Sequence, residues 1–193
     1  MQPITSTEIL SKEEYERARP DLRRRLIALK AKRRVPVGDH ATVHFETRAT
    51  MLYQVHEMLR AEDSWLRPGA VEDELEAYNP LIPAGGELSA TLMLEYETAA
   101  QRAHHLQQHV GLARHLGLTV GDTEPVAALF DNAQVSPTRI SSVQYVTWPV
   151  DAERSALLRT DGTAVRLIID HTHYRAQAVL AEETRNEIAG DLD

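Results

Sequence analysis

Residue types suited to binding or catalysis gather between Arg33 and Glu62 of the sequence. The candidates are Glu46, Arg48, Gln54, Glu57 and Arg60. A carboxylate can act as a base or a metal ligand, and a guanidinium can hold a carboxylate or phosphate through two parallel hydrogen bonds. A strand end that leads into a helix brings side chains and free amides together. The segment therefore predicts a polar site for a small anion or a partner segment.

The same residues also fit an ordinary solvated surface. Glu57 and Arg60 have the i, i+3 spacing of a pair on one helix face, and Glu46 has Arg48 or Arg34 within reach. Exposed pairs of this kind contribute little and need no ligand. Both interpretations stay open at the level of sequence.

Histidines provide a second set of candidates, for a divalent metal. His171 and His173 project to the same side of an extended chain, and His56 lies beside Glu57. A protein metal site needs a further ligand, so a metal-dependent enzyme would combine them with carboxylates such as Glu46 and Glu57. The alternative is a hairpin turn at Asp170-His-Thr-His173 with exposed imidazoles. His105 and His109 have i, i+4 spacing, but the glutamate of a His-Glu-x-x-His motif is missing.

The elements that must position these residues follow from hydrophobic periodicity. A capping box at Ser11 starts a helix that we expect to be broken at Pro20 and to continue to about residue 33. Val35 to Glu46 alternates as a strand, and helices are expected over Thr50–Glu62, Ala70–Tyr78, Ala99–Arg114 and Glu182–Ala189. Further strands are expected from Leu88 onward, including a hairpin around residues 171–173. The pattern predicts a single α+β domain over residues 1–193, with a mainly antiparallel sheet and segregated helices.

Composition narrows the classes of function. The 193-residue chain has no cysteine, which excludes disulfides, thiol nucleophiles and iron-sulfur ligation by cysteine. Flavin, nucleotide and phosphate-loop motifs are also missing from the sequence, so a divalent metal is the cofactor left to consider. The N-terminus has no secretory signal pattern and no apolar run could cross a bilayer, so we expect a cytoplasmic protein without membrane contacts. The net charge of −8 disfavours nucleic acid as a partner.

Charge is unevenly distributed along the chain. Arginines and lysines concentrate between Arg23 and Arg34, whereas acidic residues concentrate between Glu62 and Glu76. Opposite patches favour contact within the chain or between two copies. A homodimer in which the basic and acidic helices pair is therefore a third, structural interpretation.

Several segments together resemble the DUF3501 family of bacterial proteins. The matching segments are Glu14-Tyr-Glu-Arg17, Arg19-Pro20, Arg23-Arg-Arg25, Arg33-Arg-Val-Pro-Val-Gly38, Phe45-Glu46, Arg48, Thr50, Glu57-Met-Leu-Arg60, Glu62, Tyr78-Asn79, Leu81-Ile-Pro83, Glu87-Leu-Ser-Ala-Thr91, Phe130-Asp131, Val143-Gln-Tyr145, Asp170-His171 and Tyr174-Arg175. The sequence departs from the family pattern at Thr47 and His56, where asparagine and glutamine are expected, and at Thr172, where proline is expected.

The resemblance implies an accessory role near peroxide or redox metabolism. Genes of this family often lie beside genes for rubrerythrin and for a glycerol-3-phosphate-dehydrogenase-like iron-sulfur oxidoreductase. Because the sequence lacks groups that transfer electrons, the leading hypothesis is a binding protein that works with a redox partner, in a response to oxidative stress. The resemblance raises interest in Glu46, Arg48, Glu57 and Arg60 but provides no catalytic residues.

Overall fold

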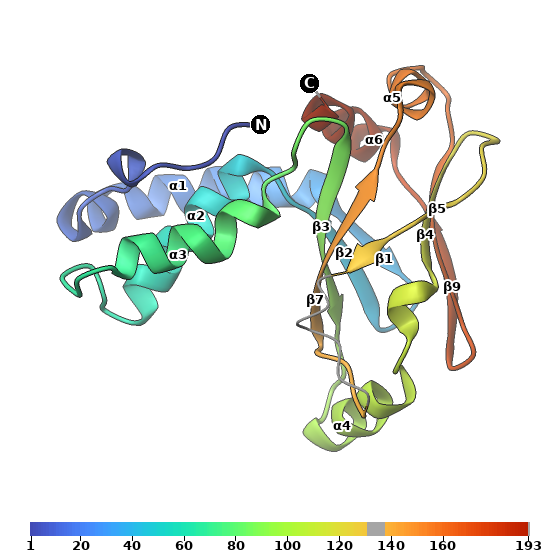
Figure 1. Cartoon of the computed structure of the whole chain (residues 1–193), viewed down its shortest axis with the longest axis horizontal. Coiled ribbons are helices and arrows are strands. Elements are labelled where there is room, and N and C mark those ends of the chain that lie inside the picture. The colour runs from blue at the N-terminus through green and yellow to red at the C-terminus, as the bar shows by residue number, and fades with distance from the viewer. Residues whose placement is uncertain (131–137, 193) are drawn as a thin grey trace.

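The computed structural model describes residues 1–130 and 138–192, so Asp131 lies outside the described residues. The described part forms six α-helices and nine β-strands arranged as a sandwich with a lateral helical extension (Figure 1). The helices are α1 (Lys12–Arg33), α2 (Arg48–Ala61), α3 (Ala70–Tyr78), α4 (Ala99–Gln108), α5 (Ala152–Leu158) and α6 (Glu182–Ala189). The strands are β1 (Arg34–Val37), β2 (Ala41–Phe45), β3 (Glu87–Leu94), β4 (Leu116–Val120), β5 (Val126–Ala127), β6 (Leu129–Phe130), β7 (Val143–Pro149), β8 (Val165–His171) and β9 (Tyr174–Val179). This arrangement confirms the predicted α+β class.

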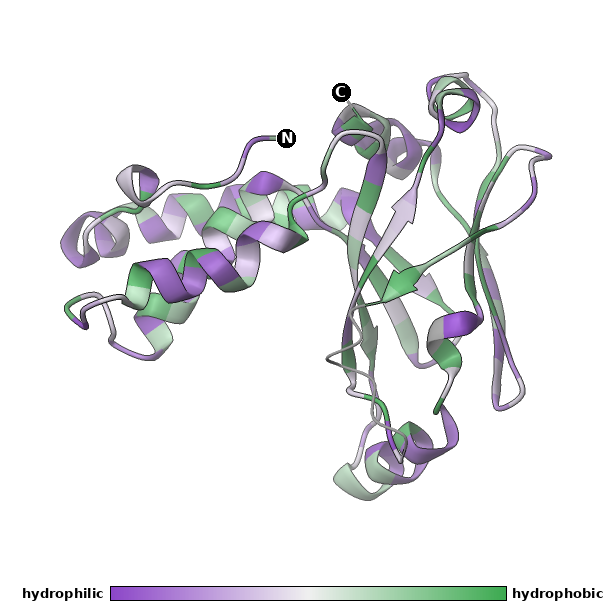
Figure 2. Cartoon of the chain, viewed as in Figure 1, coloured by the Kyte–Doolittle hydropathy of each residue, from purple (hydrophilic) through white to green (hydrophobic). Residues whose placement is uncertain are grey.

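Two antiparallel sheets make up the sandwich. One has the order β1-β2-β3-β7-β6 and the other β5-β4-β8-β9. Alternate residues of each strand enter a shared core in which Phe45 packs on Trp148, with ring centroids 5.9 Å apart. Figure 2 shows hydrophobic segments along strands of both sheets and a mixture of hydrophobic and hydrophilic residues on the helices at the side. The sandwich is the scaffold on which the other elements are mounted.

The lateral extension, here called the helical arm, consists of the N-terminal segment and helices α1 to α3 (Figure 1). Helix α1 starts as predicted, because the Ser11 side chain accepts a hydrogen bond from the Glu14 amide and the Glu14 carboxylate accepts one from the Ser11 amide. Helix α3 covers one side of α2, where Val55 and Leu59 are fully buried. The opposite side of α2 is bordered by α1 and the N-terminal segment.

Three local predictions were wrong. The helix expected over Ala99–Arg114 ends at Gln108, and a separate 3-10 turn at Leu112–Arg114 follows Gly111, which has a φ of +88°. Helix α1 continues through Pro20 without interruption, since proline removes one intrahelical hydrogen bond while the turns on both sides remain held by packing. The segment 35–46 is a hairpin of two strands, because Gly38 adopts a φ of +73° and reverses the chain. A Cβ at Gly38 would lie 2.8 Å from the Tyr174 hydroxyl and from the Ala176 Cβ, so this turn also packs closely against β9.

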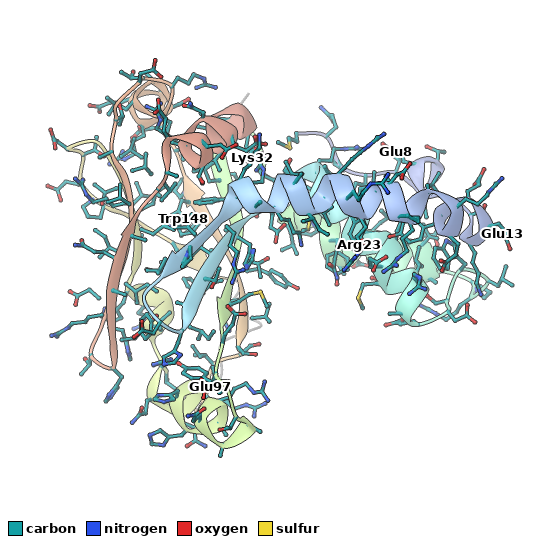
Figure 3. All side chains as sticks on the ribbon, turned by 180° about the vertical axis from the view of Figure 1, so that it is seen from behind. Glu8, Glu13, Arg23, Lys32, Glu97 and Trp148 are labelled. Atoms are coloured by element: carbon teal, nitrogen blue, oxygen red, sulfur yellow. The ribbon has the colours of Figure 1, made fainter. Side chains whose placement is uncertain are left out.

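The arm is fixed to the sandwich at the C-terminal end of α1. Arg33 is 4% exposed and forms two hydrogen bonds of 2.7 and 2.9 Å with Asp191, which lies just beyond α6. Lys32 lies beside α6 in Figure 3 and pairs with Glu183 at 3.3 Å. The basic end of α1 thus contacts the acidic C-terminal helix. Within the ranges described above, no helix has both the length and the apolar character needed to cross a bilayer.

Candidate functional site

Glu57, a predicted ligand-binding residue, is held inside the arm by α1. Its carboxylate accepts hydrogen bonds of 2.7 and 2.8 Å from the Arg19 guanidinium and one of 2.6 Å from the Tyr15 hydroxyl. The Arg19 guanidinium lowers the pKa of Glu57 from its usual 4.5 to about 2, against the opposing effect of burial. This carboxylate is therefore ionised and already bound by groups of the same chain.

The remaining polar candidates on α2 also have internal partners. Arg60 pairs with Glu16 at 2.7 Å. Arg48 holds Glu8 through hydrogen bonds of 2.5 and 2.6 Å and also donates to the carbonyl of Gln2. Gln54 hydrogen-bonds with the Tyr78 side chain. These contacts pin the N-terminal segment, α1 and the end of α3 to α2.

Glu46 lies at the junction between β2 and α2 and is 5% exposed. It accepts hydrogen bonds from the Thr50 hydroxyl at 2.6 Å and the Thr91 hydroxyl at 2.7 Å. Its two carboxylate oxygens thus join α2 to the neighbouring strand β3. The predicted strand and helix do meet here, but Glu46 serves the junction between them.

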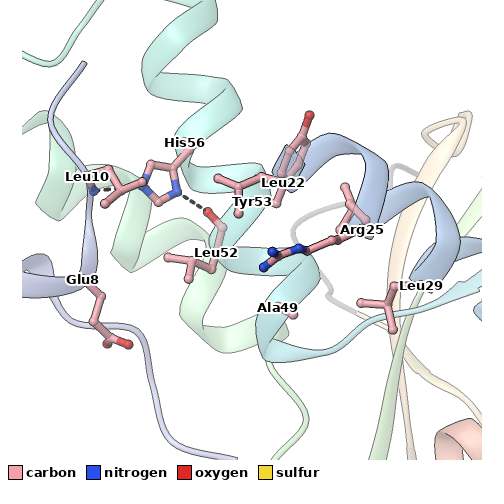
Figure 4. Close-up of a pocket in the computed structure, with 10 residues that line it drawn as sticks. Glu8, Leu10, Leu22, Arg25, Leu29, Ala49, Leu52, Tyr53 and His56 are labelled. Carbon is pink, nitrogen blue, oxygen red and sulfur yellow. Dashed lines mark hydrogen bonds between the residues drawn. The ribbon is translucent and has the colours of Figure 1, made fainter. Parts of the chain in front are cut away.

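His56 forms part of the wall between α2 and the N-terminal segment. Its ring stacks on Tyr15 with centroids 4.7 Å apart. Nδ1 lies 2.7 Å from the Leu52 carbonyl, and Nε2 accepts the Leu10 amide hydrogen bond at 3.0 Å (Figure 4). Because Nε2 is an acceptor, Nδ1 carries the proton, and burial lowers the pKa of the ring. His56 is therefore neutral, and both of its ring nitrogens have hydrogen-bond partners. Its ring forms an uncharged wall of the arm.

An apolar groove lies on this side of the arm. It has a volume of about 480 Å³. Its lining residues come from the N-terminal segment, α1 and α2: Glu8, Leu10, Leu22, Arg25, Leu26, Leu29, Ala49, Leu52, Tyr53 and His56 (Figure 4). Leu22, Leu29 and Leu52 are only half-buried because they line this opening.

The groove contains one cation that has no carboxylate partner among the described residues. Arg25 extends from α1 toward α2 in Figure 4, and its guanidinium forms no hydrogen bond or ion pair within residues 1–130 and 138–192. Glu8, the carboxylate at the groove, is already held by Arg48, which lowers the pKa of Glu8 to about 2. The groove is thus a long apolar surface with one available positive charge.

A second unusual feature lies near α4 and the β8–β9 turn. Seven of the nine histidines of the sequence belong to one network of ring contacts with Tyr96 and Tyr174, here called the histidine cluster. These histidines are His40, His104, His105, His109, His115, His171 and His173. The predicted hairpin at residues 171–173 is confirmed, since β8 and β9 pair up to His171 and Tyr174.

His109 is the most enclosed member of the histidine cluster. It is 1% exposed, and its Nδ1 lies 3.3 Å from the Tyr96 hydroxyl. Its Nε2 has no hydrogen-bond partner among the described residues. Burial, followed by the neighbouring His171 and His105, lowers the pKa of His109 to about 4. The cluster therefore packs around a neutral, buried imidazole.

The predicted metal ligands are not brought together. His56 and Glu57 lie on the arm, Glu46 at the strand-helix junction, and His171 and His173 at the β8–β9 turn. His171 Nε2 lies 3.2 Å from the Val110 carbonyl oxygen, and its Nδ1 accepts a hydrogen bond from the His173 amide. Among the described residues, no three histidine or acidic side chains form a group that could hold a metal ion.

Sequence analysis missed the groove, Arg25 and most of the histidine cluster. Hydrophobic periodicity predicted the helices that form the groove, but it does not show how much of an apolar stripe a neighbouring element covers. Nine histidines in 193 residues were a signal for the cluster. Their convergence depends on contacts between segments far apart in the chain.

Comparison with known proteins identifies the group to which the chain is similar. A solved crystal structure from Burkholderia pseudomallei, described as a novel protein of unknown function, is 33% identical and superposes with a TM-score of 0.92 over 100% of both chains. No functionally curated protein matches the chain. The family model described as a protein of unknown function, DUF3501, matches residues 3–192. On this whole-length match, the chain belongs to the DUF3501 family.

Proposed function

We propose that this protein is a binding protein whose helical arm holds an apolar ligand in the groove between α1, α2 and the N-terminal segment. The observation that carries the proposal is the half-buried state of Leu22, Leu29 and Leu52 along one opening of about 480 Å³. Ligand sites in proteins commonly have this size and are mainly apolar with few polar groups. Filling the groove would remove these leucines from water.

The polar network of the arm supports the same role. Glu57 connects α2 to α1, whereas His56 and Arg48 connect α2 to the N-terminal segment, through hydrogen bonds of 2.5 to 3.0 Å. Such contacts fix the walls before a ligand arrives, which reduces the entropy lost on binding. The residues predicted to bind a ligand directly would thus act by holding the groove open.

An accessory role beside a redox partner remains part of this proposal, supported by the family resemblance. The sequence has no cysteine for electron transfer, so the chain would contribute binding and not redox chemistry. The groove would then bind an apolar molecule that the redox partner uses.

Titration with the neutral apolar dye Nile red tests the binding function. We expect saturable fluorescence enhancement in the native protein and its loss in Ala49→Trp, because the new side chain would fill the groove from α2. Ala31→Trp places the same side chain at an exposed position of α1 outside the groove lining and should leave binding unchanged. Absence of saturable binding, or equal binding by Ala49→Trp and the native protein, would refute the proposal.

A further inference from the structure

The shape of the groove suits a chain-like molecule. The α1 wall runs from Leu22 to Leu29 and the α2 wall from Ala49 to His56. The two ends of each wall lie seven positions apart in the sequence, which corresponds to about 10 Å along a helix. Leu10 closes the third side, opposite α1. A medium-length aliphatic chain could lie along these walls and displace water from all three.

The charges of the groove select among such molecules. Glu8 is compensated by Arg48, and His56 is fixed in its neutral form. The Arg25 guanidinium therefore leaves the groove with one uncompensated positive charge. Arg23 and Arg24 precede it in the sequence. Although Arg24 pairs with Asp21, the local charge of α1 is positive, whereas the whole chain has a net charge of −8.

Arg25 is also placed as the head-group site of an amphipathic ligand. Arg25 is exposed to solvent, whereas Leu26, the next residue of α1, is only 9% exposed and also lines the groove. An anionic group could therefore bind the planar guanidinium at the solvent edge while the attached chain enters the apolar part. A guanidinium binds a carboxylate through two parallel hydrogen bonds without requiring its full desolvation at such an edge.

We propose that the groove binds an amphipathic carboxylate, with its aliphatic chain against Leu22, Leu29 and Leu52 and its carboxylate on Arg25. This inference rests on the proposed binding function and adds the chemical class of the ligand. A neutral apolar molecule would fill the same volume but leave Arg25 without a partner. A cationic amphiphile would be repelled by it.

Displacement of Nile red by octanoate and by 1-octanol tests this assignment, because the two molecules share a chain and differ in the head group. In the native protein we expect octanoate to displace the dye at a lower concentration than 1-octanol. Arg25→Gln should weaken displacement by octanoate about tenfold or more and leave 1-octanol unchanged, since a charge-assisted pair is lost. The substitution removes no internal partner among the described residues, so folding should be unaffected.

Arg23→Gln is the matched control. Arg23 lies on the same helix but outside the groove lining, about 200° around the axis from Arg25. Arg23→Gln should leave the displacement curves of octanoate and 1-octanol unchanged. This control distinguishes a local contact of Arg25 from a general effect of losing positive charge.

Each result has a distinct meaning. If Nile red binds but Arg25→Gln leaves octanoate unchanged, the carboxylate assignment fails and the binding function stands. If Nile red does not bind the native protein, the binding function itself fails. Displacement by an acidic amphipathic peptide but not by octanoate would assign the groove to a protein partner and overturn the proposal.

Discussion

Glu57 shows how a single carboxylate holds the arm together. Arg19 and Tyr15, both on α1, bind it with three hydrogen bonds, and the Arg19 guanidinium is the main reason that its pKa falls to about 2. A carboxyl whose pKa is lower in the folded state than in the unfolded state stabilises the fold above the unfolded pKa, near 4.5. That contribution is lost as the pH falls from about 4.5 to about 2.

Glu57→Gln should therefore destabilise the protein at neutral pH. The lowered pKa of Glu57 would correspond to about 3 kcal/mol in the free energy of unfolding. We expect a loss of about 2 kcal/mol, because solvent screens a side chain that is 26% exposed. Urea unfolding of both proteins at several pH values measures the difference. The deficit should shrink toward zero as the pH approaches 2.

Glu16→Gln is the control for this prediction. Glu16 also pairs with an arginine across the α1–α2 interface, but both members of the pair are more than 40% exposed. Exposed pairs contribute about 0.5 kcal/mol or less. A deficit for Glu57→Gln that stays constant with pH, or equals that of Glu16→Gln, would contradict the role assigned to Glu57.

At the scale of a secondary-structure element, helix α4 provides a second case in which a lowered pKa makes stability depend on pH. It contributes His105, and His109 is its C-cap residue. Both histidines pack against Tyr96, and His109 also contacts His171 and Tyr174 from the other sheet. Because the pKa of His109 is lowered to about 4, the unfolded chain takes up a proton at this residue near pH 6.5 while the folded chain does not. Titration of His109 therefore has no effect on stability above pH 6.5 and lowers the free energy of unfolding as the pH falls toward 4.

His109→Leu should reduce this pH dependence. A leucine keeps an apolar side chain in the buried position and removes the titrating group, so the free energy of unfolding should vary less between pH 6.5 and 4 than in the native protein. Urea unfolding across that range provides the measurement. His104→Gln, at an exposed position of the same helix, should retain the native slope. An unchanged slope in His109→Leu would refute the assignment.

Elements formed by local signals were predictable from sequence. The predicted spans of α3 and α6 match the observed ones, and the β8–β9 hairpin lies where the turn residues indicated. The β1–β2 turn was missed although Gly38-Asp39 is a turn signal, because the alternation on both sides was interpreted as one strand. Pro20 was overrated as a helix breaker.

The candidate site was less predictable than the elements. The sequence indicated the correct segment of the arm, but it did not show that Glu57 and Arg48 would be bound by residues about 40 positions away. The same limit applies to the histidine cluster, whose members come from distant segments. Whether a polar side chain is available to a ligand depends on tertiary contacts that local patterns do not contain.

At the scale of the whole molecule, the arm and the sandwich are joined through the buried pair of Arg33 and Asp191. Both side chains are 5% exposed or less, and burial raises the pKa of Asp191 while the Arg33 guanidinium opposes this effect. Removing one member of a buried pair leaves the other charge without compensation, which is far more costly than losing an exposed pair. The junction should therefore determine whether arm and sandwich unfold together.

Asp191→Ala should lower the free energy of unfolding by about 3 kcal/mol, because Arg33 would remain buried with Glu187 as its carboxylate partner at 3.1 Å. The two tryptophans report on the two parts: Trp65 packs in the arm and Trp148 in the sandwich core. Trp65→Phe isolates the Trp148 fluorescence, and the difference gives that of Trp65. We expect coincident urea transitions in the native protein and separate ones after Asp191→Ala, whereas Glu183→Ala, which removes the exposed partner of Lys32, should keep them coincident. Coincident transitions in Asp191→Ala would show that other contacts couple the arm to the sandwich.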